Sequence, residues 1–392
     1  MNELLVEARA LQRAAGSRWM RRHLVGLIEA LDHAGALTAV LYDPRLGPAP
    51  TASTRIPIEY WRRGTRRELR RLPDSSRPTY LVVTPLRQVG APHNAILPWV
   101  RELARVVVLV CGGPSVDSAD HAESGAEARQ QAHWVALRQA DVLLTTSEAL
   151  RSEVIRVLGV SPDAVVDVGM GVAPSPERAS SAPPIPWLVQ RGWPQITRPY
   201  VLHVNESGRC APALLEAWAG FAPDLRARNE FVIVSEDGEC ETEWAARAAE
   251  LGAVASVRVL GRLSDDAIGL LRRGARACVA EGSTYAPPYP MLEAMADQVP
   301  TFLARPGTNS ADSAVELLSS ELSQLLTNAS FAAAARLRAA AAGKHHAWPI
   351  VVNRLLNAVE THPARGGWSP PQGNRHAQVR IAIVGPFSSP LS

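Results

Sequence analysis

The segment Val257–Pro300 reads VRVLGRLSDDAIGLLRRGARACVAEGSTYAPPYPMLEAMADQVP, and it decides the fold. Two short apolar runs within it, Val257–Leu260 and Ala277–Ala280, are typical of buried strands. Each run is followed by a stretch with apolar residues at helical spacing, Asp265–Arg273 and then Pro290–Ala296. This alternation of strand and helix predicts βαβ units, and therefore a parallel sheet covered by helices.

The same alternation fills the rest of the C-terminal half. The further predicted strands are Tyr200–Val204, Phe231–Val234 and Pro300–Leu303, and the further predicted helices are Pro212–Phe221, Glu241–Leu251, and Ala-rich helices from Ser313 to Gly343 and from Trp348 to Glu360. Parallel sheets of this kind bind ligands at the carboxyl ends of their strands, so the loops that follow the strands are the first places to look for a site.

The N-terminal half alternates in the same way. Its predicted strands are Glu3–Glu7, Thr38–Leu41, Thr79–Thr84, Arg105–Val110, Val142–Thr145 and Val165–Val168, and its predicted helices are Arg21–His33, Glu127–Ala140 and Glu148–Leu158. Arg105–Val110 (RVVVLV) is nearly all β-branched, as buried parallel strands are. Ser147 is a suitable N-cap for the helix Glu148–Leu158. The half therefore predicts a second parallel sheet.

A proline-rich stretch separates the two halves. Seven prolines lie from Pro174 to Pro199, with serines and little periodicity, so we interpret the stretch as a linker. We expect an α/β fold of two Rossmann-like domains facing across a cleft. The predicted limits are 1–175 for the N-terminal domain, 176–198 for the linker, 199–347 for the C-terminal domain and 348–360 for a helix that crosses back to the N-terminal domain.

Residues 361–392 form a tail with its own character. Thr361–Gln378 is rich in proline and glycine, and Val379–Gly385 (VRIAIVG) follows it as a buried strand that ends in a glycine turn. Two interpretations stay open. The strand joins one of the two sheets, or it is the first strand of a further domain.

Composition excludes several classes of protein. The chain has 392 residues, 46% of them hydrophobic and 20% charged, with a net charge of +3, which is too small an excess to indicate a nucleic-acid partner. No apolar run approaches the roughly 18 residues of a membrane span, and we expect no secretory signal in Met1–Arg13. The four cysteines show no pairing at short spacing, which suits reduced thiols in a cytoplasmic protein.

Five segments of the C-terminal half, in order, resemble the donor-binding domain of the retaining GT-B glycosyltransferases of family 4, the group 1 glycosyl transferases. The segments Val257–Asp266 (VRVLGRLSDD) and Pro290–Pro300 (PMLEAMADQVP) carry the resemblance most specifically. Ala140–Gly171 is similar to the end of the same family's acceptor domain, and Glu7–Leu31 is similar to its opening strand, glycine loop and first helix. The resemblance covers roughly residues 3–360.

The resemblance implies an enzyme that moves a hexose from a nucleotide diphosphate sugar to a polysaccharide or glycolipid acceptor, with retention and without a cofactor. We expect no metal site, since no carboxylate or histidine cluster has ligand spacing. A departing diphosphate builds negative charge, which needs cations or N–H donors. A carboxylate can hold ribose or sugar hydroxyls.

The resemblance implies five donor-binding residues. Glu293 is expected to lie in the first turn of a helix with Pro290 at its first position, and to contact the ribose of the nucleotide. Arg209 sits where the family has a cation for the diphosphate. Tyr285 either bonds a sugar hydroxyl or packs, and the loop with Gly16 and Arg18 nears the donor phosphates. No catalytic residue is identified.

The sequence departs from the family at the donor loop. Tyr285 stands where the family has the first of two glutamates, and Ala286-Pro287-Pro288 replaces Gly-Phe-Gly, so that two prolines remove two N–H donors. These departures support an alternative function, a degenerate non-catalytic GT-B module of a tandem glycosyltransferase. The strand in Val379–Gly385 would then open the next domain.

A basic run between Arg62 and Arg71 contains six arginines beside Trp61. Such runs are either solvated or attracted to anionic lipid headgroups. The second reading suits a lipid-linked acceptor and predicts a cytoplasmic protein with peripheral contact on the inner face of the membrane.

Overall fold

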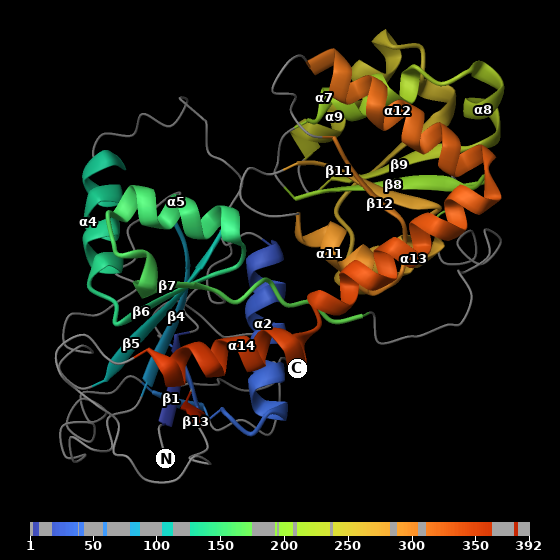
Figure 1. Cartoon of the computed structure of the whole chain (residues 1–392). Coiled ribbons are helices and arrows are strands. Elements are labelled where there is room, and N and C mark those ends of the chain that lie inside the picture. Colours follow the sequence, from blue (N-terminus) through green and yellow to red (C-terminus); the bar gives the residue numbers. More distant parts are fainter. Residues whose placement is uncertain are drawn as a thin grey trace, which may run out of the picture. The chain divides into compact units, whose positions relative to one another are not determined.

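The chain forms two compact α/β units in the computed structural model (Figure 1). Unit 1 is drawn from Met1–Gly171 and Trp348–Ser392, and unit 2 from Val172–Ser283 and Pro287–Ala347. The residues that the structure describes are 3–7, 18–37, 39–42, 58–60, 79–86, 104–112, 126–174, 193, 196–206, 210–235, 238–282, 288–304, 311–362 and 380–382.

Unit 1 is built on a parallel sheet. Its strands are β1 (Glu3–Glu7), β2 (Ala39–Tyr42), β3 (Ile58–Tyr60), β4 (Thr79–Pro85), β5 (Arg105–Cys111), β6 (Val142–Thr145), β7 (Val165–Asp167) and β13 (Arg380–Ala382). The order is β3-β2-β1-β4-β5-β6-β7, every pair is parallel, and β13 pairs with β1. Successive strands are therefore added toward one edge of the sheet from β1 to β3, and toward the other edge from β4 to β7. The order reverses between β1 and β4, as in a Rossmann sheet.

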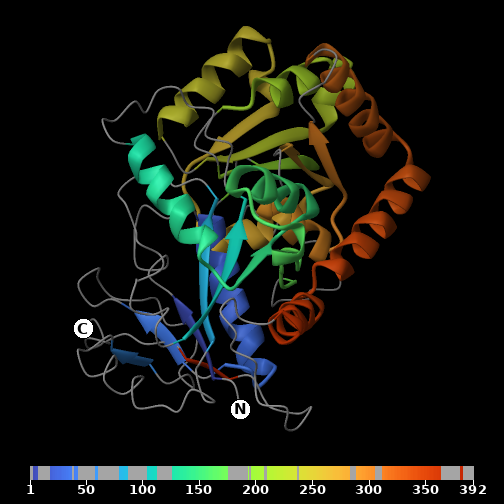
Figure 2. The ribbon, with the colours of Figure 1, turned by 60° about the vertical axis from the view of Figure 1, so that its left-hand side comes forward.

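Helices pack against this sheet. They are α2 (Arg18–His33), α4 (Ala126–Arg138), α5 (Glu148–Leu158), the short 3₁₀ helix η4 (Pro162–Ala164) and α14 (Trp348–Thr361). The predicted N-cap of α5 is confirmed, because the Ser147 hydroxyl accepts a hydrogen bond from the amide of Leu150 at 3.1 Å. Figure 1 and Figure 2 both show α14 lying beside α2.

Close packing fixes the start of α14. A Cβ added at Gly171 would lie 2.2 Å from the Trp348 ring, and one added at Gly26 would lie 2.7 Å from it, so only glycine fits at either position. The His23 ring lies 5.1 Å from the Trp348 ring. The other end of α14 is held by Arg105, whose guanidinium donates to the carbonyls of Val359 and His362.

Unit 2 is a five-stranded parallel sheet with the order β10-β9-β8-β11-β12. Its strands are β8 (Tyr200–Asn205), β9 (Glu230–Ser235), β10 (Val257–Leu260), β11 (Ala277–Glu281) and β12 (Thr301–Ala304). Its helices are α7 (Pro212–Ala219), α8 (Pro223–Arg228), α9 (Gly238–Glu250), the 3₁₀ helix η5 (Val254–Ser256), α10 (Asp265–Gly274), α11 (Tyr289–Ala296), α12 (Ala311–Thr327) and α13 (Ala329–His345). In order of sequence the strands lie 3-2-1-4-5, which is again the Rossmann arrangement.

The core of unit 2 lies on both faces of its sheet. Along β9, Phe231 and Ile233 belong to one apolar cluster, and Val232 and Val234 belong to another. This period of two is what a strand buried on both faces requires. The predicted α/β class with two Rossmann-like parts is thus confirmed.

One prediction of local structure needs revision, and one of the two interpretations of the tail strand is supported. The helical stretch from Ser313 to Gly343 is two helices, because Asn328 ends α12 and caps α13 by accepting from the amides of Ser330 and Phe331. In the tail, Arg380–Ala382 is a strand of the first sheet, while the remainder of the predicted strand 379–385 lies outside the described residues.

Candidate functional site

The site in unit 2 begins at the point where the strand order reverses. β8 and β11 are neighbours, and the chain leaves them toward α7 and α11, which belong to crossovers on opposite sides. Loops that diverge in this way leave a crevice at the carboxyl ends of the two strands, where ligands of such sheets bind. Arg209 and Tyr285 belong to these two loops, but both lie outside the described residues, as does Gly16.

Glu293 lies on α11, directly after this reversal. It is the fifth residue of the helix, because α11 begins at Tyr289 with Pro288 as the N-cap. The prediction that Pro290 occupies the first position and Glu293 the first turn is therefore wrong. Pro290 is the second residue, where a missing N–H costs as little as at the first. Glu293 is consequently too far from the helix end to be stabilised mainly by the helix dipole.

An arginine takes over that stabilising role. Arg272, in the last turn of α10, donates from Nη1 to the Oε2 atom of Glu293 at 2.8 Å and from Nε to the Oδ2 atom of Asp297 at 2.8 Å. The exposed fractions of the three side chains are 5% for Arg272, 11% for Glu293 and 4% for Asp297. We call these three residues the Arg272 triad.

The triad carries a formal charge of −1, because one guanidinium faces two carboxylates. Burial by itself lowers the pKa of the Arg272 guanidinium, but the charges of Glu293 and Asp297 outweigh it and raise that pKa above its ordinary value. The guanidinium is therefore charged at any physiological pH.

The amino end of α11 has few donors to offer a phosphate. Pro288 and Pro290 have no N–H, and the amides of Met291 and Leu292 both donate to the carbonyl of Pro288, at 2.9 and 3.3 Å. Helix ends that bind anions present unused N–H groups. A diphosphate in this unit would therefore depend on the loop cations for its charge.

Unit 1 has its own reversal point, between β1 and β4. Arg18, a predicted donor residue, is the first residue of α2 and is half-buried there. The carboxyl end of β4 is held by three side chains of α4. Gln130 and Trp134 each donate to the Leu86 carbonyl at 3.1 Å. His133 donates to the Pro85 carbonyl at 2.9 Å. Burial lowers the pKa of His133, which keeps the ring neutral.

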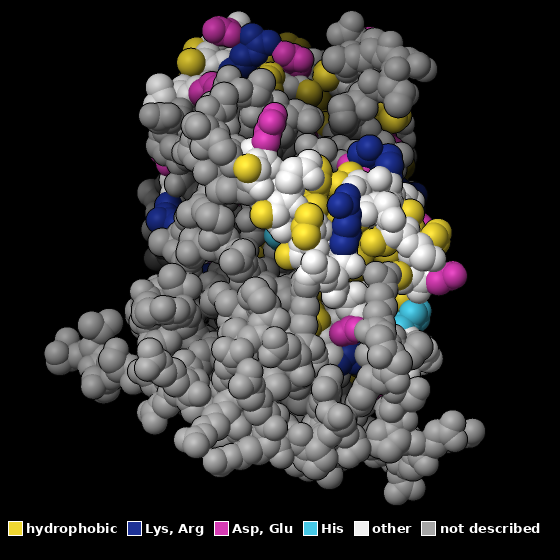
Figure 3. All heavy atoms as spheres, turned by 90° about the vertical axis from the view of Figure 1, so that its left-hand side faces the viewer, with side chains coloured by type: hydrophobic (Ala, Val, Ile, Leu, Met, Phe, Trp, Pro, Cys, Tyr) yellow, Lys and Arg dark blue, Asp and Glu magenta, His cyan; other side chains and the backbone are white. Residues whose placement is uncertain are grey.

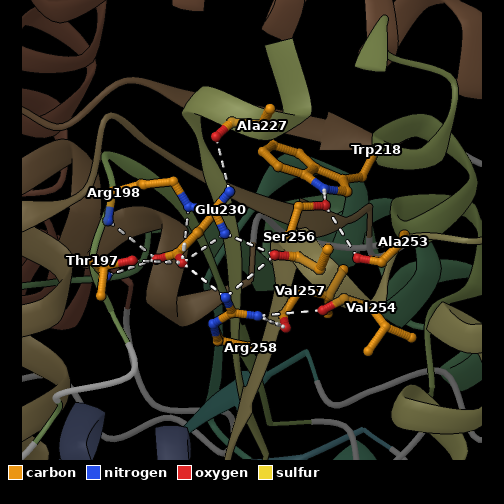
Figure 4. A network of polar contacts seen from close by, with 11 residues as sticks. Thr197, Arg198, Trp218, Ala227, Glu230, Ala253, Val254, Ser256, Val257 and Arg258 are labelled. Carbon is orange, nitrogen blue, oxygen red and sulfur yellow. Dashed lines mark hydrogen bonds and ion pairs between the residues drawn. The ribbon is translucent and has the colours of Figure 1, made fainter. Parts of the chain in front are cut away.

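A larger polar network in unit 2 lies at the opposite edge of the sheet (Figure 4). Glu230, at the start of β9, is fully buried and pairs with Arg198 at 3.0 Å and Arg258 at 3.1 Å. It also accepts from the amide of Thr197 at 3.1 Å. Because the network joins the amino ends of β8, β9 and β10, it anchors the chain that enters the sheet and is not a ligand site.

Buried thiols do not supply a nucleophile. Burial raises the pKa of the Cys111 thiol and of the Cys278 thiol to about 12, so both stay protonated. Within the described ranges, no cluster of three or more histidine, cysteine or acidic side chains has the arrangement of a metal site.

Among the helices that the structure describes, none has the length and apolar character of a membrane span. The basic run from Arg62 to Arg71 lies outside the described residues. On the face seen in Figure 3, the described side chains of hydrophobic, basic and acidic type are interspersed.

Arg272 and Asp297 were not predicted from the sequence. An arginine in the last turn of a helix usually faces solvent, where it complements the helix dipole. The available signal was spacing, because Arg272 is four residues after the buried Ile268 and adjoins the buried Leu271, which puts it on the apolar stripe of α10. A charge on such a stripe requires a buried partner.

Comparisons with known proteins identify the fold. No protein-family model matches the chain, and a search of curated proteins finds no match. Among solved structures, Anabaena HepE in complex with UDP and glucose has a TM-score of 0.59 at 12% identity, covering 92% of this chain and 99% of that one. Sucrose-phosphate synthase from Thermosynechococcus elongatus has a TM-score of 0.58 at 15% identity, covering 92% and 98%. A glycosyltransferase from Rickettsia africae has a TM-score of 0.55 at 11% identity, covering 91% and 97%.

These likenesses agree with the strand order of both units. The chain has the GT-B-type fold of two Rossmann-like α/β units, which glycosyltransferases share. At such low identity the comparison defines the fold, and the activity has to be argued from the site.

Proposed function

We propose that the chain is a glycosyltransferase that moves a hexose from a nucleotide diphosphate sugar to a polysaccharide or glycolipid acceptor with retention. Glu293 carries this proposal, because it lies on α11, the helix that follows the reversal point of unit 2. The likeness to HepE supports a nucleotide sugar as donor, since structures of that protein contain UDP and UDP-glucose.

In this proposal, each predicted donor residue has a distinct chemical task. Glu293 accepts hydrogen bonds from the ribose hydroxyls, and Tyr285 contacts the sugar. Arg209 neutralises the charge that builds on the diphosphate as it leaves. The departing diphosphate accepts the proton of the attacking acceptor hydroxyl, so the step needs no dedicated protein base and no metal.

A thermal-shift panel of nucleotide sugars tests the donor site. Binding to the folded state raises the apparent stability, so the right nucleotide sugar raises the melting temperature of the wild-type chain. Glu293→Gln is expected to abolish most of that shift while leaving the unliganded melting temperature nearly unchanged, because Arg272 and Asp297 remain paired. Glu316→Gln is the matched control, since Glu316 is an exposed residue of α12 in the same unit. Equal shifts in the wild type and Glu293→Gln would contradict the assignment.

A second candidate function is a non-catalytic module that binds a nucleotide sugar without transferring it. The amino end of α11 favours this function. Pro288 and Pro290 have no N–H group there, and the amides of Met291 and Leu292 already donate to the Pro288 carbonyl, so few N–H donors remain to stabilise a leaving diphosphate. Release of free nucleoside diphosphate from the donor found in the panel separates the candidates. Enzymatic release above the background rate supports transferase activity, and binding without release supports the module.

We also propose peripheral contact with an anionic membrane through the run from Arg62 to Arg71. Salt screens such attraction, so vesicles with acidic lipids should bind the chain at low salt and release it at high salt. Binding that is indifferent to salt would argue against this contact.

A further inference from the structure

We propose that Cys210 and Cys240 form a dithiol site, which a hydroperoxide oxidises to an intramolecular disulfide. The site lies at the carboxyl edge of the sheet of unit 2, on the apolar face that α7 and α9 cover. It goes beyond the proposed function, because formation of the disulfide requires neither a nucleotide nor a sugar.

The pairing of β8 with β9 brings the two cysteines to adjacent places. The strands are parallel, and Asn205, the last residue of β8, is opposite Ser235, the last residue of β9. Cys210 follows the first of these strand ends by five residues, and Cys240 follows the second by five residues. Neighbouring strands lie about 4.8 Å apart, so the two segments that lead to the cysteines leave the sheet from adjacent positions.

The helix α9 turns Cys240 toward the core. Cys240, Trp244 and Ala248 follow one another at intervals of four residues, and all three are buried in the same apolar cluster. The centroid of the Trp244 ring lies 5.5 Å from that of the His203 ring on β8, so the first turns of α9 lie over the carboxyl half of this strand. β8 leads to Cys210, which packs against the same cluster.

Electrostatic coupling supports this proximity. Burial raises the pKa of the Cys210 thiol to about 11, and the negative charges of Glu243, Cys240 and Glu281 contribute to the rise. A charge on Cys240 acts on Cys210 in this way at short range, since charges are screened beyond about 10 Å. Cys210 is half-buried whereas Cys240 is 5% exposed, so an oxidant reaches Cys210 first.

The other two cysteines do not fit either place. Cys278 lies on β11 and belongs to the apolar cluster on the opposite face of the sheet, and Cys111 is fully buried on β5 within unit 1. All four cysteines of the chain are described, and none is in a disulfide. A disulfide needs Cβ atoms about 4 Å apart, so Cys210 and Cys240 are the pair that the fold brings together.

The oxidation balances with one peroxide molecule. The Cys210 sulfur attacks one peroxide oxygen as a thiolate, the O–O bond breaks, and a sulfenic acid and a water form. The Cys240 sulfur then attacks the sulfenic sulfur, the S–O bond breaks, and the second oxygen leaves as water. The two thiols lose two electrons and two protons, which reduce the peroxide to water. Because the pKa of Cys210 is raised, little thiolate is present at pH 7, so the pair responds to sustained oxidant.

The disulfide has a defined place in unit 2. It joins the first turn of α9 to the residue directly after Arg209, the cation that the proposed function assigns to the diphosphate. Its meaning for the donor loop rests on the proposed function, whereas its formation does not.

Thiol counting on the full chain tests the inference. The native protein is incubated with hydrogen peroxide, unfolded and treated with N-ethylmaleimide, and mass spectrometry then counts the thiols that reacted. The wild type is expected to lose two of its four reactive thiols while keeping the mass of a single chain, and to regain both after dithiothreitol. Proteolytic digestion is expected to yield one peptide pair joined through Cys210 and Cys240.

Matched variants separate this pair from the other thiols. Cys240→Ala is expected to abolish the linked peptide pair. Cys278→Ala is the control and should form the link as the wild type does, because Cys278 is also 5% exposed but lies on the opposite face of the sheet. If Cys240→Ala does not fold, Cys210→Ser changes a half-buried position and should abolish the link as well. Absence of the linked pair from the oxidised wild type, or a link through Cys111 or Cys278, would overturn the inference.

Discussion

Gln298, the residue after the C-cap of α11, has a left-handed backbone with φ of 62°. Its amide donates to the carbonyl of Met295, and the next amide, of Val299, donates to Ala294, so the conformation is imposed by the helix ending. A residue with a Cβ is strained there by roughly 1–2 kcal/mol. Gln298→Gly is expected to raise the free energy of unfolding by about 1 kcal/mol, measured by urea denaturation. Gln324→Gly, in an exposed position of α12, should lower it by a similar amount, and a loss at both positions would contradict the account.

His203 on β8 makes unit 2 sensitive to acid. Burial lowers the pKa of its ring to about 4, although its Nδ1 atom bonds the Val279 carbonyl at 3.0 Å. The unfolded chain takes up this proton near pH 6.5, so stability is complete above about pH 6.5 and falls as the pH drops toward 4. The loss from this group is on the order of 3 kcal/mol.

Urea denaturation at pH 7, 5.5 and 4.5 measures that loss. His203→Gln should show a smaller decrease in unfolding free energy than the wild type, because it removes one of the groups that bind protons on unfolding. Exposed His345→Gln is the control and should follow the wild type. An unchanged pH dependence in His203→Gln would show that the ring is not buried as a neutral group.

Single residues of the site were only partly predictable from the sequence. Glu293 was found because it stands in a recognisable motif, PMLEAMA, and the structure places it on the expected helix. Its true environment was not found, since the partner Arg272 is 21 residues away and comes from another helix. Pairings between elements depend on how the helices pack, and no local pattern encodes them.

At the scale of elements, α11 and α13 approach each other through Gly343. A Cβ at this position would lie 2.5 Å from the Met295 carbonyl oxygen, which is backbone and cannot give way by a rotamer change. Gly343→Ala is expected to cost about 1–3 kcal/mol of unfolding free energy by overpacking, and to weaken nucleotide binding because α11 carries Glu293. Gly220→Ala is the matched control, since its Cβ would meet its neighbours at an ordinary 3.5 Å. Equal stability of the two variants would contradict this close approach.

The Glu230 network gives a second prediction for elements. Glu230→Ala would leave Arg198 and Arg258 without their shared carboxylate at the buried start of β9, and breaking a buried pair costs about 3–5 kcal/mol. Glu216→Ala removes a solvent-exposed pair with Arg247 and should lower the stability far less. Chemical denaturation of the two variants compares these costs, and a similar small loss for both would show that the network does not anchor the sheet.

The first and last residues of helices and strands could be predicted from the sequence where the signal was local. The run Val106–Val110 is apolar and nearly all β-branched, and it lies in a strand, Arg105–Cys111, that is buried at every residue. The break between α12 and α13 was missed, because an Ala-rich composition is helical on both sides and Asn328 alone marks the cap. The strand Ile58–Tyr60 was missed as well, since a strand of three residues has too few alternations to be distinguished from a loop.

At the scale of the whole molecule, two Rossmann sheets with the same reversal of order define the fold. This was predictable because strand and helix alternate regularly in both halves of the chain. What the fold does was less predictable, since it depends on a few side chains at the reversal points. The account therefore stands on Glu293 as part of a nucleotide site.

Calorimetric titration of the preferred nucleoside diphosphate into the wild type and Glu293→Gln tests this claim most directly. The account predicts a Kd about 10- to 100-fold weaker for Glu293→Gln, which corresponds to about 1.5–3 kcal/mol for hydrogen bonds to a charged group. An identical Kd for the two proteins, both shown to be folded, would contradict it.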